Sequence, residues 1–184
     1  MNVPNTLTVI RMILIPVFVL LYCFQLEYWN LYAGIIFVAA SLTDLLDGYL
    51  ARKWNQVTTF GKFFDPIADK LLVLAALLIL MDCGMIAMWA VLVLLAREFF
   101  ISGFRLVAVS KGIVIAADMS GKIKTAVQMV SLALLLFGGL LFGWFGLLLG
   151  QIGIYASVAL SVYSCIAYLC KYKNVFHDDN QEVG

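Results

Sequence analysis

Residues 44–69 read DLLDGYLARKWNQVTTFGKFFDPIAD. Four aspartates, Asp44, Asp47, Asp65 and Asp69, stand in this stretch, although the whole chain has only 11 acidic residues. The first two are three residues apart and the last two are four apart, so on helices each pair shares one face. Carboxylates in an apolar chain are costly and are rarely kept without a partner. Two such pairs on neighbouring helices predict an all-oxygen site for a hard divalent cation, Mg²⁺ or Mn²⁺.

The composition around this stretch is that of a membrane protein. The chain has 184 residues, of which 64% are hydrophobic and 12% are charged, and its mean hydropathy is +1.02. A soluble domain has roughly 45–50% apolar and about 25% charged residues. We therefore expect one membrane-embedded domain over 1–184 with a polar tail at 174–184, and no nucleic-acid partner. The first apolar run is long and lacks a small-residue cleavage site, so we interpret it as a membrane span and not as a signal peptide.

Six stretches reach the roughly 20 mostly apolar residues that a membrane-spanning helix needs. They cover about 6–25, 31–53, 62–82, 86–109, 122–142 and 149–171. The connections after the first, third and fifth stretches contain no lysine or arginine; they are about 25–30, 82–85 and the glycine-rich 143–146. The sequence thus predicts an all-α integral membrane protein with six transmembrane helices.

The distribution of charge predicts the orientation of these spans. All 12 basic residues fall toward the opposite ends of the six stretches. By the positive-inside rule, both termini and the second and fourth loops face the cytoplasm. The aspartate stretch joins the second and third spans at this same end. Because proline is tolerated only near the first turn of a helix, Pro66 places Asp65 and Asp69 close to the start of the third span.

A second group of charges gathers in the fourth span and at the start of the fifth. Its basic members are Arg97, Arg105, Lys111, Lys122 and Lys124. An arginine inside a membrane either pairs with a carboxylate or binds an anionic ligand. Glu98 and Asp118 are too few to neutralise five cations. The pattern favours a phosphate-binding pocket over simple contacts of loop lysines with anionic lipids.

The cysteines and the histidine exclude other chemistry. Cys23, Cys83, Cys165 and Cys170 lie in or beside apolar runs and form no C-x-x-C, so we interpret them as small packing residues and not as zinc or redox ligands. The only histidine, His177, is in the polar tail, which argues against a serine–histidine or cysteine–histidine mechanism in the core.

Two small motifs have competing explanations. Gly48 and Gly61 leave the backbone open to a ligand, although helix packing in the membrane is the commoner reason for an isolated glycine. Asn5, Thr6 or Thr8 either caps the first helix or contacts a ligand.

The aspartate stretch resembles the signature of a known family. The pattern is D-x-x-D-G-x-x-A-R-x8-G-x-x-x-D-x-x-x-D, and all of its fixed residues are present: Asp44, Asp47, Gly48, Ala51, Arg52, Gly61, Asp65 and Asp69. On this pattern the chain is identified as a member of the CDP-alcohol phosphotransferases. The resemblance implies the six-helix fold of that family, with its active site at the cytoplasmic end of a bacterial membrane, and a homodimer.

The resemblance also implies a role for each matching residue. Asp44, Asp47 and Asp65 would hold two metal ions, Mg²⁺ or Mn²⁺, with Asp69 completing the second site and serving as the general base. Contacts to the donor, CDP-diacylglycerol, would come from Asn5, Thr8, Gly48, Arg52, Thr58 and Gly61, where Thr58 matches by position only. Membrane lipids would surround the acyl chains.

The acceptor is indicated by three less specific motifs. These are Asn5-x-x-Thr8-x-x-Arg11, Arg97-Glu98 with Arg105, and Gly121-Lys122-x-Lys124-Thr125. They are similar to those of bacterial family members that use sn-glycerol 3-phosphate, whose phosphate would bind Arg97, Arg105, Lys122 and Lys124 within the region 97–125. Inositol phosphate, serine or phosphatidylglycerol remain alternative acceptors. An ion transporter is a weaker alternative, because the acidic cluster lies at one side of the membrane and not at its midplane.

Overall fold

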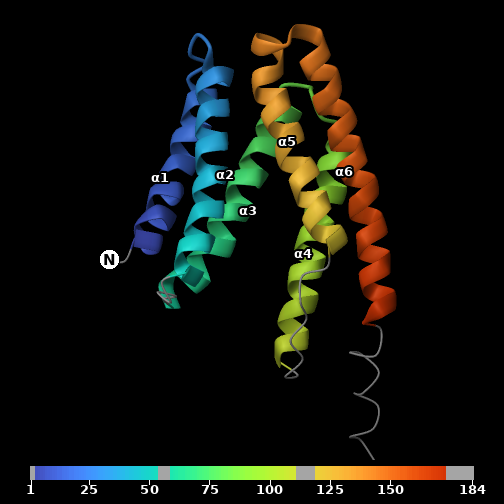
Figure 1. Cartoon of the computed structure of the whole chain (residues 1–184). Helices are drawn as coiled ribbons and strands as arrows, with labels where there is room; N and C mark the ends of the chain where they lie inside the picture. The colour runs from blue at the N-terminus through green and yellow to red at the C-terminus, as the bar shows by residue number, and fades with distance from the viewer. Residues whose placement is uncertain (1–2, 54–58, 111–118, 173–184) are drawn as a thin grey trace, which may run out of the picture.

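The computed structural model describes residues 3–53, 59–110 and 119–172; within its helices, the side chains at 3–5, 44–53, 59–63, 65–66 and 138 are not described. Over these ranges the regular elements are six helices (Figure 1). They are α1 (Val3–Cys23), α2 (Trp29–Lys53), α3 (Thr59–Asp82), α4 (Met88–Ser110), α5 (Met119–Leu141) and α6 (Gly143–Lys171). The predicted all-α class is confirmed.

Two of the predicted boundaries are wrong. The sixth helix begins at Gly143 and not near residue 149, because the glycine-rich segment continues the helix and Phe142 alone links it to α5. Gly143 has a φ of +55°, a left-handed conformation that glycine adopts readily, and this makes such a short turn possible. The third helix begins at Thr59, so Pro66 is its eighth residue and does not lie in its first turn.

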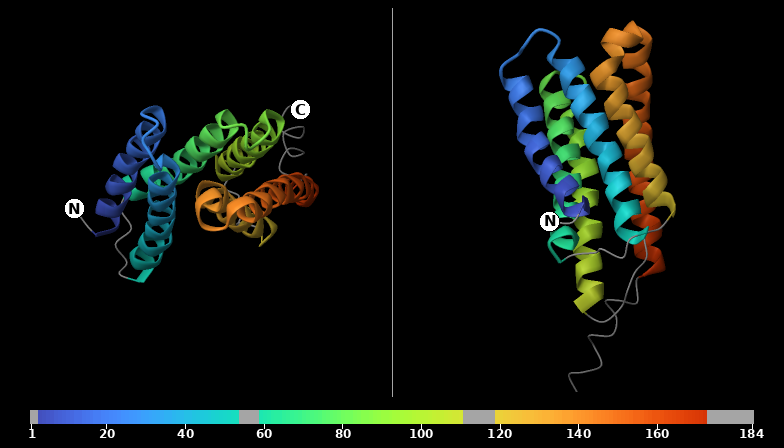
Figure 2. Two further views of the ribbon diagram at one scale, coloured as in Figure 1. Left: turned by 90° about the horizontal axis from the view of Figure 1, so that it is seen from above. Right: turned by 60° about the vertical axis from the view of Figure 1, so that its left-hand side comes forward.

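Successive helices run in opposite directions. The helices α1, α3 and α5 begin at the end of the bundle where α2, α4 and α6 finish (Figure 1). We call this the basal end and the other the distal end. Seen from above, α1 and α2 form one side of the bundle and α5 and α6 form the other (Figure 2). The most extensive packing joins α5 to α6 and α1 to α2 and α3.

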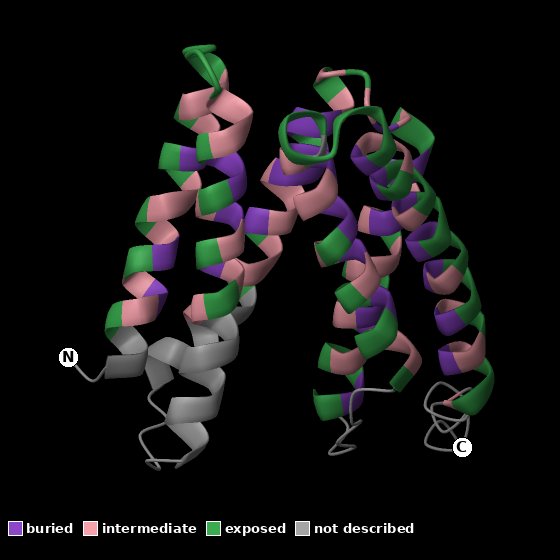
Figure 3. Ribbon diagram, turned by 45° about the horizontal axis from the view of Figure 1, so that its top comes forward, coloured by how far each residue is buried: buried purple, intermediate pink, exposed green. Residues whose placement is uncertain are grey.

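The outer surface is apolar, as expected of a membrane protein. In the described part of the chain, three segments are long and apolar enough to cross a bilayer: Thr6–Cys23, Met119–Phe137 and Gly143–Lys171. Large apolar side chains face outward, among them Leu106 and Trp144, which are 73% and 75% exposed. Buried and exposed positions alternate around the helices (Figure 3).

Glycine brings α6 close to α5. An added Cβ at Gly150 would lie 2.7 Å from Cγ of Leu135, and one at Gly153 would lie 2.1 Å from Oγ of Ser131. Neither position has space for a side chain. Small residues that allow backbones to approach are typical of helix pairs in membranes, so these two glycines fix the α5–α6 pair that carries one wall of the bundle.

The four cysteines are free thiols. Cys83 packs against the main apolar core and Cys165 against a smaller cluster around Phe104 and Tyr168, whereas Cys23 and Cys170 are exposed. Desolvation raises the pKa of the Cys83 thiol, which lies in the connection after α3, so the thiol stays protonated at neutral pH. His177 lies outside the described residues.

Candidate functional site

A cavity of about 320 Å³ lies between α3, α4 and α5. Its walls are mostly apolar side chains from these three helices. Its polar lining residues are Asp69, Lys70, Glu98, Lys124, Thr125 and Gln128. A largely apolar pocket with a few convergent polar groups is the usual form of a small-molecule site.

Asp69 is the aspartate of the predicted metal cluster whose side chain is described. It lies on α3, is half-buried and lines the cavity. Asp44 and Asp47 fall near the end of α2, and Asp65 falls in the first part of α3, so each predicted pair does lie on one helix. The end of α2 and the start of α3 both lie at the basal end (Figure 1). The side chains of Asp44, Asp47 and Asp65 lie outside the described set.

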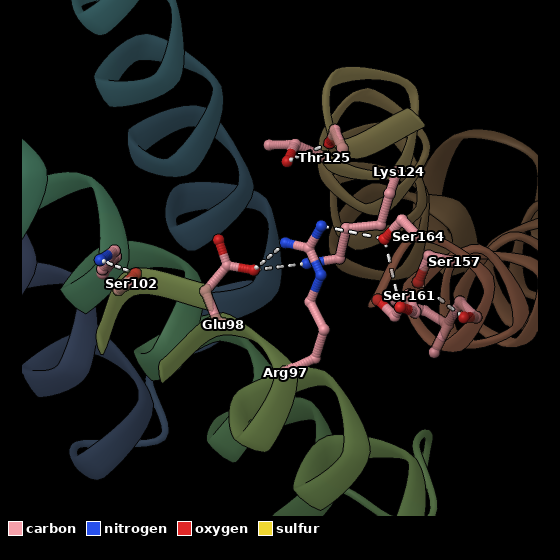
Figure 4. Close-up of polar contacts among 11 residues, drawn as sticks. Arg97, Glu98, Ser102, Lys124, Thr125, Ser157, Ser161 and Ser164 are labelled. Atoms are coloured by element: carbon pink, nitrogen blue, oxygen red, sulfur yellow. Dashed lines mark hydrogen bonds and ion pairs between the residues drawn. The ribbon is translucent and has the colours of Figure 1, made fainter. Parts of the chain in front are cut away.

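An ion-pair network borders the cavity on the side of α5. Glu98 of α4 accepts hydrogen bonds on Oε2 from Nζ of Lys124 at 2.9 Å and from Nη1 of Arg97 at 3.2 Å (Figure 4). Nη2 of Arg97 donates to Oγ of Ser164 on α6 at 2.9 Å. The side chains of Lys124 and Arg97 are 3% and 12% exposed, and that of Glu98 is 34% exposed. Glu98 is therefore the most exposed member of the network, and it lines the cavity together with Lys124.

The network joins three helices, and its chemistry explains the local sequence. A buried ammonium is tolerated only where a carboxylate compensates the lost hydration. Gly121 of α5 is explained by Arg97, because an added Cβ there would lie 3.3 Å from Nη2 of the guanidinium. Behind the network, Ser157, Ser161 and Ser164 of α6 are buried, which makes the inner face of that helix polar.

A second cation lines the same cavity and was not predicted from the sequence. Lys70 follows Asp69 on α3, and its Nζ donates to Oγ of Ser102 on α4 at 2.7 Å. The signal that could have found it is its position beside the last aspartate of the signature. The contact with Ser102 could not have been predicted from the sequence, because it depends on how α3 packs on α4.

The predicted phosphate-binding residues are divided among different surroundings. Lys124 lines the cavity, whereas Arg97, Arg105 and Lys122 do not. The guanidinium of Arg105 lies over the ring of Tyr168 on α6, 5.9 Å from its centroid. Lys122 is exposed.

The predicted donor-binding residues lie mostly outside the described side chains. Gly48 and Arg52 fall in the last part of α2 and Gly61 in the first turn of α3. Thr58 lies outside the described residues altogether. On α1, Thr8 and Arg11 are buried, at 1% and 0% exposed.

The suggestion that the N-terminal polar residues cap the first helix is wrong. The helix α1 begins at Val3, so Asn5, Thr6 and Thr8 all lie inside it. Contact of Asn5 and Thr8 with a ligand stays a prediction.

The predicted metal site stays a prediction, and its residue types fit a hard divalent cation. Among the described side chains, no three of the histidine, cysteine, aspartate and glutamate residues come together. The predicted metal ligands are all carboxylate oxygens, which are the ligands that Mg²⁺ and Mn²⁺ prefer. Half-buried Asp69 at a cavity wall fits one corner of such a site.

Comparisons with known proteins give one consistent result. The family model described as CDP-alcohol phosphatidyltransferase matches residues 1–163. The protein named CDP-diacylglycerol–glycerol-3-phosphate 3-phosphatidyltransferase from Bacillus subtilis is 40% identical over 182 residues, covering 92% of this chain and 94% of that protein. Proteins of the same name are 37% identical in Rickettsia typhi, covering 95% and 99%, and 42% identical in Escherichia coli K12, covering 74% and 77%.

Proposed function

The chain belongs to the CDP-alcohol phosphatidyltransferase family, and on this premise we propose that it transfers the phosphatidyl group of CDP-diacylglycerol to sn-glycerol 3-phosphate. The products are phosphatidylglycerophosphate and CMP. The observation that carries the proposal is the likeness to enzymes of that name along nearly the whole chain. The complete signature in residues 44–69 supports the phosphotransfer chemistry.

The donor half of the site is assigned to the ends of α2 and α3. Asp44, Asp47, Asp65 and Asp69 would hold Mg²⁺ or Mn²⁺ in an all-oxygen site. Bound ions would supply positive charge to the pyrophosphate and to the leaving CMP. The planar guanidinium of Arg52 can donate two parallel N–H hydrogen bonds to the same phosphates. The other proposed contacts to CDP-diacylglycerol come from Gly48 and Gly61 of the signature, from Asn5 and Thr8 of α1, and from Thr58.

The acceptor half is assigned to the cavity. A hydroxyl oxygen of the acceptor forms a bond to the phosphorus that carries diacylglycerol, and the bond from that phosphorus to CMP breaks. Asp69 accepts the proton that the hydroxyl loses. Lys124 lies at the wall of the same cavity, where its ammonium can bind the acceptor's phosphate. Glu98 holds that ammonium in place, and Arg97 binds the same carboxylate oxygen.

The remaining proposed acceptor contacts are more distant from this cavity. Arg105 and Lys122 do not line it, so we assign them a smaller contribution to acceptor binding. Their charge attracts the anionic acceptor to the basal end.

We place the enzyme in a bacterial plasma membrane as a homodimer of six-span subunits. The basal end faces the cytoplasm, because all 12 basic residues of the sequence lie toward that side of the predicted spans. Both termini are then cytoplasmic. This orientation gives the site access to glycerol 3-phosphate from the cytosol while the acyl chains of the donor stay in lipid.

The function is tested by an acceptor screen on the purified protein in lipid vesicles with CDP-diacylglycerol and Mg²⁺. Release of CMP is measured with sn-glycerol 3-phosphate, inositol phosphate, serine and phosphatidylglycerol in turn. We expect release with glycerol 3-phosphate and formation of phosphatidylglycerophosphate. Release with serine and none with glycerol 3-phosphate would show that the acceptor assignment is wrong.

A further inference from the structure

Lys70 differs from Lys124 in how its charge is balanced. Both lysines line the cavity. Lys124 donates to the carboxylate of Glu98, whereas Lys70 donates to the neutral hydroxyl of Ser102. Among the described side chains, no carboxylate forms an ion pair with Lys70, and the ion pairs of Glu98 go to Arg97 and Lys124.

This difference makes Lys70 the more available cation of the two. A lysine ammonium has three donors, and Ser102 takes one of them. A hydroxyl orients an ammonium but does not neutralise it. Lys70 is half-buried and has no ion-pair partner among the described side chains. Such a cation within a membrane bundle is a functional-site hypothesis by default. Its ammonium is thus held in place with two donors left for an anion.

We propose that Lys70 is a substrate-binding residue that contacts the phosphate of the acceptor. The proposal rests on the proposed function and adds to it a residue that selects for phosphorylated acceptors. Lys70 lies next to Asp69 on α3, and neighbouring positions on a helix are about 100° apart around its axis. An acceptor can then place its reacting hydroxyl at Asp69 and its phosphate at Lys70 within one cavity.

The position of Ser102 supports this assignment. It comes from α4, the helix that also supplies Glu98 to the cavity. Its hydrogen bond, 2.7 Å long, holds a flexible lysine side chain across the α3–α4 boundary. A lysine already fixed in its bound position loses less conformational freedom when the anion arrives. The phosphate therefore meets a cation from α3 on one side and Lys124 from α5 on the other.

The test compares wild type with Lys70→Met, Lys70→Gln and Lys70→Arg in purified form. The measurements are kcat, KM for glycerol 3-phosphate, KM for CDP-diacylglycerol, and inhibition by inorganic phosphate in competition with the acceptor. We expect Lys70→Met to raise the acceptor KM and to weaken phosphate inhibition by on the order of 10- to 100-fold, the range of a lost charged hydrogen bond. The donor KM should stay unchanged, and Lys70→Arg should recover most of the loss.

Lys171→Met is the matched control. Lys171 is exposed at the end of α6, where its ammonium lies 5.5 Å from the centroid of the Tyr172 ring, and it does not line the cavity. The control removes the same charge elsewhere and should leave the acceptor KM as in wild type. If Lys70→Met fails to fold, Lys70→Gln decides, because it keeps a polar side chain that can reach Ser102.

The outcomes separate this inference from the function on which it rests. Wild-type acceptor KM and phosphate inhibition in a folded Lys70 variant would overturn the role of Lys70 while leaving the transferase intact. A lower kcat with unchanged phosphate inhibition would overturn it too, because that is the result of a structural role. A wild-type protein that releases no CMP with glycerol 3-phosphate would instead contradict the proposed function.

Discussion

The two ends of the helical bundle are held together by different chemistry. At the distal end, where α3 finishes and α4 begins, the hydroxyl of Tyr22 donates to the carboxylate of Asp82 across the α1–α3 boundary. The rings of Trp89 and Tyr155 stack there with centroids 5.7 Å apart. These contacts join helices through aromatic surface and one exposed hydrogen bond.

Toward the basal end, an ion-pair network is added to aromatic packing such as that of Phe104 against Tyr168. Lys124 is buried at 2% exposed and depends on Glu98, and Arg97 shares the same carboxylate oxygen. Asp69 and Lys70 line the adjoining cavity. Replacing buried ion pairs by apolar residues of similar volume is often neutral or stabilising. Stability alone therefore does not explain the charges near the basal end, whereas it does explain the distal contacts. This contrast indicates that the functional site lies near the basal end.

The sharpest way to test this contrast is to neutralise Asp69. Asp69→Asn removes the proposed base and one metal ligand, so we expect kcat to fall by about 10²- to 10⁴-fold, the usual contribution of a general base. The measurement is CMP release by purified protein. Tyr22→Phe at the distal end is the control. Activity within twofold of wild type in Asp69→Asn would contradict the assignment.

Removing the counter-ion of Lys124 tests the ion-pair network. Glu98→Gln leaves a buried ammonium uncompensated, so we expect unfolding free energy to fall by about 1–3 kcal/mol, allowing for the partial exposure of Glu98. The acceptor KM should rise about tenfold, because Lys124 is no longer held at the cavity wall. The readouts are thermal unfolding in detergent and acceptor kinetics.

A double variant sharpens that result. In Glu98→Gln with Lys124→Met, the uncompensated charge is gone, so the loss of stability should be smaller than the sum of the two single losses. Additive losses would mean that the two side chains do not stabilise each other.

A smaller effect is expected for Arg105. Its guanidinium lies over the Tyr168 ring and outside the cavity lining. We predict that Arg105→Ala raises the glycerol 3-phosphate KM by roughly two- to fivefold, as for a charge that attracts the substrate without a direct bond, and leaves donor KM alone. An unchanged acceptor response would mean that Arg105 makes no contribution to acceptor binding.

The smallest effect belongs to the distal end. Tyr22→Phe removes the hydrogen bond to Asp82 but keeps the ring, which packs edge-on against Trp29 with centroids 5.1 Å apart. Because the bond is exposed, we expect a loss of less than about 1 kcal/mol in stability and no change in kcat. Thermal unfolding measures the change in stability, and CMP release measures the change in kcat. A marked loss of activity would mean that the distal hydrogen bond also contributes to catalysis, contrary to the contrast between the two ends.

The comparison of sequence and structure shows what can be inferred without tertiary packing. Apolar runs of sufficient length predict the six helices. The glycine-rich stretch predicts a loop before residue 149, whereas Gly146 and Gly150 are buried within α6. Pro66 predicts a helix that begins close to it, whereas α3 begins at Thr59. Glycine favours loops and proline favours the first turn of a helix only on average, and packing against neighbouring helices can override these preferences.

The site shows the same limit. The aspartate pairs could be predicted because three- and four-residue spacings are local properties of a helix. The pairing of Lys124 with Glu98 joins residues 26 positions apart and follows from the packing of α5 on α4. Lys70 and Ser102 are 32 positions apart, and no local pattern relates them. Sequence reasoning therefore found the residue types of the site but not the contacts between helices.

The central claim is that carboxylates at the basal end hold divalent cations that activate a lipid-linked nucleotide for attack by glycerol 3-phosphate. The most direct measurement is CMP release from CDP-diacylglycerol in vesicles, with Mg²⁺ or Mn²⁺ titrated after removal of metal by a chelator, in wild type and in Asp44→Asn. We predict that wild-type release requires both the cation and glycerol 3-phosphate, and that Asp44→Asn shows none at any cation concentration. Release by wild type without a divalent cation, or full activity in Asp44→Asn, would contradict the claim.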